Sequence, residues 1–151
     1  MNDVLVREAT AADGPAIVGL IRSLAEFEHL PGPTDADAAR LVEHGFGPMR
    51  HFESLVAETD GRVVAYAIFF TTYSTFLARP TLFLEDLFVH PGARRHGVAT
   101  ALMTRLRALA VERGCGRFEW MVLDWNAVAQ ALYARVGAEQ LHEWRLCRVV
   151  L

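Results

Sequence analysis

The sequence predicts a single α/β (α+β) domain in which helices flank a mixed central β-sheet. The chain has 151 residues, which suits one domain with a core of ordinary size. Segments rich in β-branched and aromatic residues alternate with segments whose apolar residues recur every three or four positions. Glycine and proline turns separate these segments, and no repeat or linker interrupts them. We expect the order β-α-α-β-β-β-α-β-α-β, with residues 1–151 as one domain.

The first elements are a strand over residues 4–7 and two helices. Asp13 favours a helix cap and Pro15 a first turn. The apolar stripe of this helix is Ile17, Leu20, Ile21, Leu24 and Phe27. Prolines and a glycine at 31–33 end it, and a weaker helix is expected over residues 34–44.

Strand patterns dominate the middle of the chain. Residues 52–58 and 62–72 are expected to form a hairpin through Asp60-Gly61, which favours a two-residue turn. Residues 82–89 are a nearly continuous apolar run, typical of a strand buried at the centre of a sheet.

The remaining elements alternate between helix and strand. A helix ending at Gly114 is expected from an inner stripe at Val98, Leu102, Leu106 and Leu109. A strand over residues 117–123 and a helix over residues 126–136 follow, and the last strand is expected over roughly residues 144–150.

Composition excludes several classes of protein. Hydrophobic residues make up 52%, charged residues 22%, and the net charge is −3, so neither nucleic acid nor a membrane surface is an expected partner. Cys115 and Cys147 have no CxxC spacing, which favours a reducing, cytoplasmic location. The six histidines show no metal-binding spacing, so we expect no metal. No segment is apolar enough to span a membrane, and no secretory signal pattern is present.

The most informative segment covers residues 84–100, where an apolar strand with two carboxylates leads through a basic loop into a helix. The loop, Arg94 to Ala99, fits the pattern R-x-x-G-x-A. Gly97 removes a Cβ where a ligand could approach the backbone, and the helix start offers N–H groups to an anion. The alternative is a plain turn with solvated arginines, and the loop alone does not decide between them.

Glu85 and Asp86 interrupt that apolar strand. Successive strand residues point to opposite faces, so we expect the two acids in different environments. In the structural alternative, one acid is exposed or faces an edge and the other forms a salt bridge. In the functional alternative, one of them acts as a base at the mouth of a cleft. The local sequence favours a structural role for Asp86 and leaves the role of Glu85 open.

Two further groups of residues allow both a structural and a chemical interpretation. Asn126 and Tyr133 are seven residues apart and share a helix face, where Asn126 could simply cap the helix and Tyr133 could be a core residue or a proton donor. Phe27-Glu28 and Glu119-Trp120 pair acids with aromatic rings, which can hold an ammonium ion. Without further information, an ordinary helix end and strand are favoured there.

Together these motifs resemble the GNAT superfamily of acetyl-CoA-dependent N-acetyltransferases. The loop at 94–99 matches the family's Q/R-x-x-G-x-G/A pyrophosphate loop, and residues 126–138 match its later N-x-x-A…Y…G-A helix. Residues 7–13, 84–86, 124–126 and 144–146 resemble the spermidine/spermine (diamine) and thialysine acetyltransferase branch.

The resemblance implies roles for specific residues. Glu85 would be the base and Tyr133 the acid. The cofactor-binding residues would be Leu87, Phe88, Val89, Arg94, Arg95, His96, Gly97, Val98, Ala99, Thr100, Asn126, Ala129 and Tyr133. The amine site would be lined by Phe27, Glu28, Glu85, Glu119, Trp120 and Met121. Phe27 replaces the branch's tyrosine, and a shortened loop makes Glu143 a poor match for an acceptor-site acid.

The expected function is therefore transfer of an acetyl group from acetyl-CoA to a primary amine of a diamine, polyamine or thialysine-like acceptor. Glu85 would act through water, because a normal glutamate is a poor direct base for an ammonium ion. The resemblance also implies a homodimer, to which the apolar tail at 146–151 could contribute. The alternatives are a protein or peptide N-acetyltransferase and a non-catalytic CoA-binding sensor domain.

Overall fold

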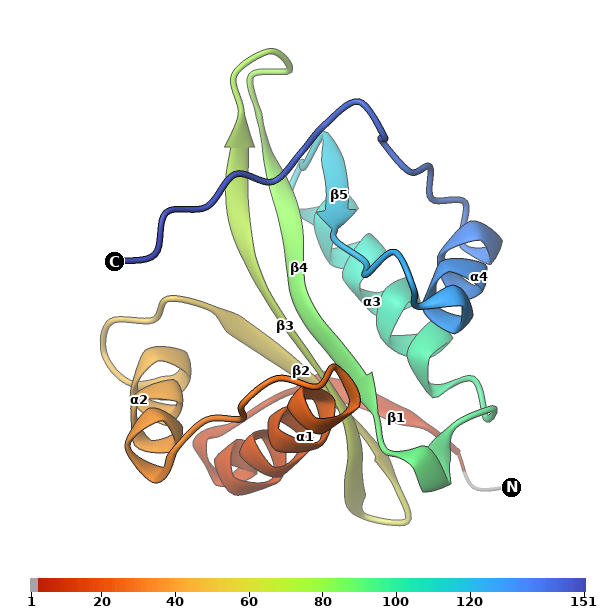
Figure 1. Ribbon diagram of the computed structural model, residues 1–151. Coiled ribbons are helices and arrows are strands. Elements are labelled where there is room, and N and C mark those ends of the chain that lie inside the picture. The colour runs from red at the N-terminus through yellow and green to blue at the C-terminus, as the bar shows by residue number, and fades with distance from the viewer. Residues whose placement is uncertain (1–2) are drawn as a thin grey trace. The chain divides into compact units, whose positions relative to one another are not determined.

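The computed structural model describes residues 3–151, which form two compact units, one up to Met121 and one over Val122–Leu151. The first unit contains a five-stranded sheet in the order β1-β2-β3-β4-β5 (Figure 1). Its strands are β1 (Leu5–Glu8), β2 (Glu53–Thr59), β3 (Arg62–Ser74), β4 (Arg79–Val89) and β5 (Arg117–Trp120). Strands β1 to β4 are antiparallel and β5 runs parallel to β4. The predicted mixed-sheet fold class is confirmed.

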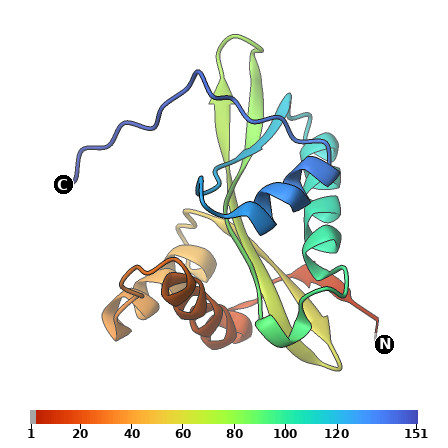
Figure 2. The same cartoon turned by 45° about the vertical axis from the view of Figure 1, so that its right-hand side comes forward.

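Helices cover both faces of this sheet. Helices α1 (Gly14–Phe27) and α2 (Asp35–Phe46) lie on one face, and α3 (Val98–Glu112) lies on the other, as the two views in Figures 1 and 2 agree. Two short 3-10 turns, η1 (Ala11–Asp13) and η2 (Pro91–Ala93), precede α1 and α3. Helices α1 and α3 are amphipathic, and each buries apolar side chains on the side that faces the strands: Ile17, Val18 and Leu20 of α1 and Val98, Leu102 and Leu106 of α3.

The core between α1 and the sheet explains the position of a buried tyrosine. The buried cluster there contains Ile17, Leu20, Val56, Tyr66, Ile68 and Phe88. Tyr66 is 0% exposed, so its hydroxyl must find a hydrogen-bond partner inside the protein. That partner is Asp86 on β4, which links this core to the strand with the two carboxylates.

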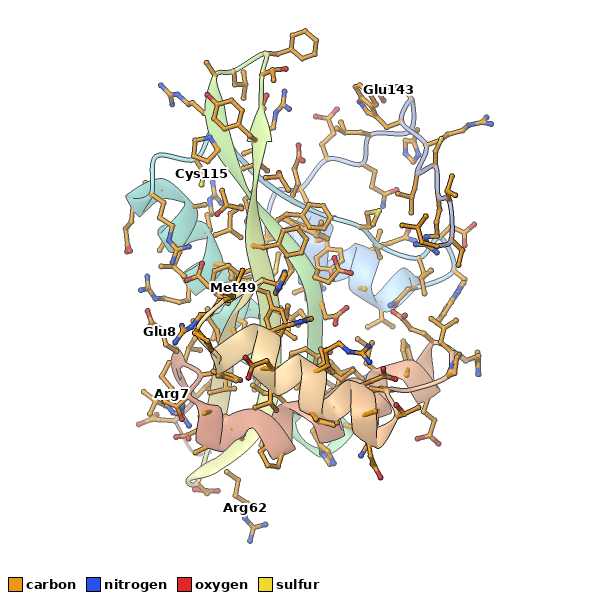
Figure 3. All side chains as sticks on the ribbon, turned by 90° about the vertical axis from the view of Figure 1, so that its left-hand side faces the viewer. Arg7, Glu8, Met49, Arg62, Cys115 and Glu143 are labelled. Atoms are coloured by element: carbon orange, nitrogen blue, oxygen red, sulfur yellow. The ribbon has the colours of Figure 1, made fainter. Side chains whose placement is uncertain are left out.

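The β2–β3 hairpin turns where the sequence predicts. Asp60 and Gly61 have φ angles of 52° and 71°, the left-handed conformation that a two-residue turn requires. Arg62, labelled in Figure 3, begins β3 and projects away from the sheet at this turn.

A corner formed by β1, η1 and β2 is held by charge. Arg7, labelled in Figure 3, donates to both carboxylate oxygens of Asp13 at 2.8 and 2.9 Å and to Glu58 at 3.1 Å. Asp13 stands at the start of α1 as predicted, but its side chain does not cap that helix. It accepts a hydrogen bond from the Thr10 backbone N–H at 2.7 Å instead. Hydrogen bonding to Arg7 lowers the pKa of Asp13 to about 2.

The second unit contains α4 (Ala127–Arg135). The Asn126 side chain accepts a hydrogen bond from the Ala129 N–H at 3.1 Å, so the predicted cap is confirmed. The strand expected over residues 144–150 is absent: after α4, the described chain has neither helix nor strand. Residues 144–151 are exposed, and a β-forming sequence becomes a strand only where a ladder partner covers it.

Candidate functional site

Strand β4 has one edge that is only half covered. Strand β5 pairs with Thr81–Leu84 and no further, so within the first unit the rest of β4 has a neighbouring strand only on the β3 side. The predicted cofactor-binding residues Leu87, Phe88 and Val89 lie on this part of β4, opposite Ala67, Tyr66 and Ala65 of β3. A ligand with amide groups could hydrogen-bond along this edge in the way a strand would.

The loop after β4 ends in an open helix terminus. Arg95 and Gly97 have φ angles of 64° and 75°, and Gly97 occupies the cap position of α3 without a side chain to cap it. A Cβ built on Gly97 would meet nothing within 4 Å. The first N–H groups of the helix, at Val98, Ala99 and Thr100, have no partner within the helix, so they can bind an anion. The residues present therefore fit a pyrophosphate at this turn.

Arg94 holds this loop against the core. Its Nε donates to the Val89 carbonyl at 3.1 Å, and its guanidinium lies 5.2 Å from the centroid of the Phe88 ring and 5.7 Å from that of Phe27. The structure thus brings a predicted cofactor-binding residue and a predicted amine-site residue into contact. Arg95 and His96 are exposed.

The two carboxylates of β4 lie at a β-bulge, an irregularity in the pairing of β4 with β3. Asp86 pairs with Ile68, Leu84 pairs with Phe69, and Glu85 is the extra residue between them. Paired residues face the same side, and Ile68 and Phe69 face opposite sides because they are adjacent. Leu84 and Asp86 consequently face opposite sides although they are two residues apart. Strict alternation therefore fails at the bulge, but the two acids do differ in environment as expected, because Glu85 is exposed and Asp86 is partly buried.

Asp86 has an environment that the sequence did not predict. It is partly buried, and its Oδ2 accepts a hydrogen bond from the Tyr66 hydroxyl at 3.4 Å. Within residues 3–151 it forms no salt bridge, so it is not the salt-bridged acid of the structural alternative. Burial, together with the charges of Glu85 and Glu28, raises the pKa of Asp86 to about 6. Burial and the Asp86 charge raise the pKa of Tyr66, which keeps its proton and remains the donor.

The predicted amine-site residues of β5 lie beside the bulge. Trp120 pairs with Leu84, the residue before Glu85, and Glu119 pairs with Phe83. The Trp120 ring lies 4.7 Å from the Phe118 ring between centroids. Glu119 approaches Arg117 at 3.9 Å, and Met121 is exposed. Because paired residues face the same side, Glu119 shares the face of Asp86, whereas Trp120 shares the opposite face with Leu84.

The other predicted site residues belong to the second unit. Asn126 and Ala129 form the capped start of α4, and Tyr133 lies one further turn along, partly buried. The carbonyl of Tyr133 accepts the N–H of Ala138 at 3.0 Å, which closes the helix end before Gly137 turns the chain. Glu143, labelled in Figure 3, is exposed.

Residues 3–151 offer neither a metal-binding cluster nor a membrane-spanning helix. Their histidines, cysteines and acids form no group of three or more that could hold a metal ion. None of their helices has the length and apolar character needed to cross a membrane.

The acetyltransferase (GNAT) family matches residues 15–138. The chain belongs to this family. It is 35% identical over 151 residues to the thialysine N-epsilon-acetyltransferase of Sus scrofa, covering 95% of this chain and 88% of that protein. It is 29% identical to the human spermidine/spermine N(1)-acetyltransferase-like protein 1, covering 98% of this chain but 23% of that longer protein. The protein is thus an N-acetyltransferase.

The fold of this N-acetyltransferase is also that of solved relatives. The aminoglycoside N-acetyltransferase AAC(6')-Iy, solved in complex with CoA, superposes with a TM-score of 0.76 at 22% identity, covering 99% of this chain and 96% of that one. At this identity the likeness supports the fold alone.

Proposed function

We propose that this enzyme transfers the acetyl group of acetyl-CoA to a primary amine of a small cationic acceptor, such as a diamine, a polyamine or a thialysine-like amino acid. One observation carries the proposal: the charges of Glu85 and Glu28 both act on Asp86 beside the bulge of β4, and Glu119 of β5 shares the face of Asp86. Several negative charges gathered in this way suit a compact cation. The names of the thialysine and spermidine/spermine relatives support the same class of acceptor.

Acetyl-CoA supplies an acyl thioester, and the chain offers groups to hold it. We assign the pyrophosphate to the loop from Arg94 to Thr100, because Gly97 leaves the helix start open. We assign the pantetheine arm to the uncovered edge of β4 at Leu87–Val89. Asn126 and Ala129 of α4 are cofactor-binding candidates through the family resemblance. Membership of the acetyltransferase (GNAT) family supports acetyl-CoA as the acetyl donor.

Two residues handle protons in this proposal. A primary ammonium has a pKa near ~10.4 and must lose a proton before its nitrogen can attack. Glu85, exposed on β4, takes that proton through water. The departing thiolate has a pKa near ~8.5, and the Tyr133 hydroxyl returns a proton to it. Tyr133→Phe and Glu85→Gln should each lower kcat by ~10²-fold or more, because each removes a proton-transfer group.

A panel of amines tests the acceptor class. The enzyme with acetyl-CoA should acetylate diamines, polyamines and thialysine faster than monoamines that carry no second charged group. Glu28→Gln should raise KM for a dication more than for a monoamine, because one contact between charges is lost. Glu26→Gln is the matched control, since Glu26 is an exposed acid near the end of the same helix. Turnover of peptides with no turnover of free amines would refute the small-amine proposal.

The assembly of the enzyme completes the proposal. We infer that the two compact units are parts of one catalytic domain, because the family match runs across their boundary. We also infer a cytoplasmic homodimer. Leu146, Val149, Val150 and Leu151 are each at least 64% exposed, and a second copy could cover them. Light scattering at micromolar concentration should give twice the chain mass, and a monomer there would overturn the dimer.

A further inference from the structure

We propose that Asp86, held by the buried hydroxyl of Tyr66, is a second proton acceptor in the reaction and receives through water the second proton that the acceptor amine loses. The inference rests on the proposed function, in which an amine must be deprotonated beside β4. It assigns a reaction step to a residue that the sequence favours as structural.

The geometry that carries this proposal is the bulge. Because Glu85 is the extra residue, Asp86 shares a face with Ile68, and so lies on the α1 side of the sheet, where Tyr66 and Phe88 are buried. Leu84 pairs with Phe69 and faces the other way. In a regular strand, Asp86 would lie on the same face as Leu84. The bulge therefore selects the side on which this carboxylate lies.

Tyr66 fixes the orientation of the carboxylate. The tyrosine is 0% exposed and packs in the core with Ile17, Leu20 and Val56. Its hydroxyl donates to Oδ2 of Asp86, which leaves the other oxygen, Oδ1, for a water or a proton. A carboxylate held by a rigid, buried donor is preorganised for proton transfer.

The titratable groups that face Asp86 are two glutamates and a neutral tyrosine. Glu85 lies beside it on β4, Glu28 follows α1, and Tyr66 comes from β3. The two glutamates and burial raise the pKa of Asp86 to about 6, while the Tyr66 hydrogen bond acts in the opposite direction. A base whose pKa lies just below the working pH is more efficient than one with a much lower pKa, because it is deprotonated at rest and still binds a proton strongly. Asp86 meets this condition at neutral pH.

The step balances with the groups already named. The ammonium loses its first proton through water to Glu85, as in the proposed mechanism, and the neutral amine keeps its electron pair. That pair forms the new C–N bond at the acyl carbon while the C–S bond breaks. The nitrogen loses its second proton through water to Oδ1 of Asp86, and Tyr133 protonates the thiolate in the proposed mechanism. Asp86 then releases its proton to solvent, and Tyr133 takes one back.

The pH dependence of kcat/KM tests the proposal. The wild-type profile should fall on its acid side with a midpoint near 6. Asp86→Asn should remove that midpoint and lower the plateau by ~10²-fold. Tyr66→Phe should move the midpoint to higher pH, because the charged carboxylate loses its donor. Glu28→Gln should move the midpoint to lower pH, because a neighbouring negative charge is lost.

Matched controls separate chemistry from folding. Tyr73→Phe removes a hydroxyl from an exposed tyrosine of the same strand, and its midpoint should stay at the wild-type value. Acetyl-CoA affinity by calorimetry should be unchanged in all variants. If Asp86→Asn does not fold, the opposite shifts of Tyr66→Phe and Glu28→Gln decide the question.

Two results would overturn the assignment: an unchanged acid midpoint and rate in folded Asp86→Asn, or unshifted midpoints in both Tyr66→Phe and Glu28→Gln. A wild-type enzyme that acetylates no amine at all would instead refute the proposed function. In that case, carboxyl carbon NMR of Asp86 still tests its local chemistry. A titration midpoint near 4 would contradict the inference on its own.

Discussion

Two aspartates, Asp13 in the β1–η1 corner and Asp86 at the β4 bulge, are taken out of water in opposite ways. Asp13 faces Arg7, which binds both of its oxygens, and its pKa falls to about 2. Asp86 faces a tyrosine and two further acids, and its pKa rises to about 6. The first arrangement stabilises the charged form in the folded state, while the second destabilises it.

The difference teaches how to distinguish a structural acid from a chemical one. A carboxylate paired with a cation contributes to folding and has little proton affinity left for chemistry. A carboxylate kept among other acids lowers stability, and a protein retains such a cost where a site needs it. The open helix start at Gly97, in the loop that follows β4, belongs to the same chemical region.

The largest expected effect comes from placing a charge in that region. Gly97→Asp should weaken acetyl-CoA binding by ~10²-fold or more, because a carboxylate would meet the phosphates at the open helix start and the residue has a positive φ. Calorimetry with acetyl-CoA measures the change.

Gly61→Asp is the matched control. Gly61 also has a positive φ, of 71°, and open space at its Cβ, but it lies in the β2–β3 turn. This variant should bind acetyl-CoA as the wild type does. Equal losses in both variants would show that backbone strain, rather than the anion site, causes the effect.

The next effect concerns the corner. Asp13→Asn should lower the free energy of unfolding at neutral pH by about 2 kcal/mol. The pKa of Asp13 is lower in the folded protein than in the unfolded chain, so its charge stabilises the fold at every pH above the pKa of the unfolded chain. That stability is lost as the pH falls through the window from about 4 to 2. Denaturant melts across this range should bring wild type and variant together at its acid end, with kcat unchanged at neutral pH.

Asp86→Asn should act in the opposite direction. The folded protein holds the Asp86 proton up to about pH 6, so wild-type stability falls as the pH rises from about 4 to 6 and stays lower above it. The variant lacks this penalty and should be more stable at pH 7 by about 1 to 2 kcal/mol. The gain should vanish below pH 4. A variant destabilised at every pH would mean that the Tyr66 hydrogen bond outweighs the cost of the charge.

The sequence predicts the features that depend on residues close together in the chain. The Asp60-Gly61 turn, the Asn126 cap and the loop at Gly97 depend on neighbouring residues, and all three form where the sequence places them. A strand over residues 144–150 would need a pairing partner from elsewhere in the chain. No strand forms there, so that prediction is wrong.

The contact of Asp86 escaped prediction because Tyr66 and Asp86 are 20 residues apart and meet only through the sheet register. The same holds in the corner of Asp13 for Arg7 and Glu58, which are 51 residues apart, although Arg7 and Asp13 themselves are six apart. The bulge at Glu85 shows only in the pairing of β3 with β4. A run of apolar residues with two acids predicts a strand, but not which acid faces the core.

The smallest expected effect compares the open start of α3 with a closed one. The start of α2 carries its own cap: Thr34 Oγ1 accepts the Asp37 N–H at 3.1 Å, and Asp37 accepts the Thr34 N–H at 3.0 Å. Thr34→Ala should therefore cost about 1 kcal/mol of stability, because a helix N–H loses its acceptor. Acetyl-CoA affinity and kcat should not change, since these N–H groups already have a protein partner. A loss of cofactor affinity in Thr34→Ala would mean that a capped helix start also serves the site, and the distinction between the two helix starts would then fail.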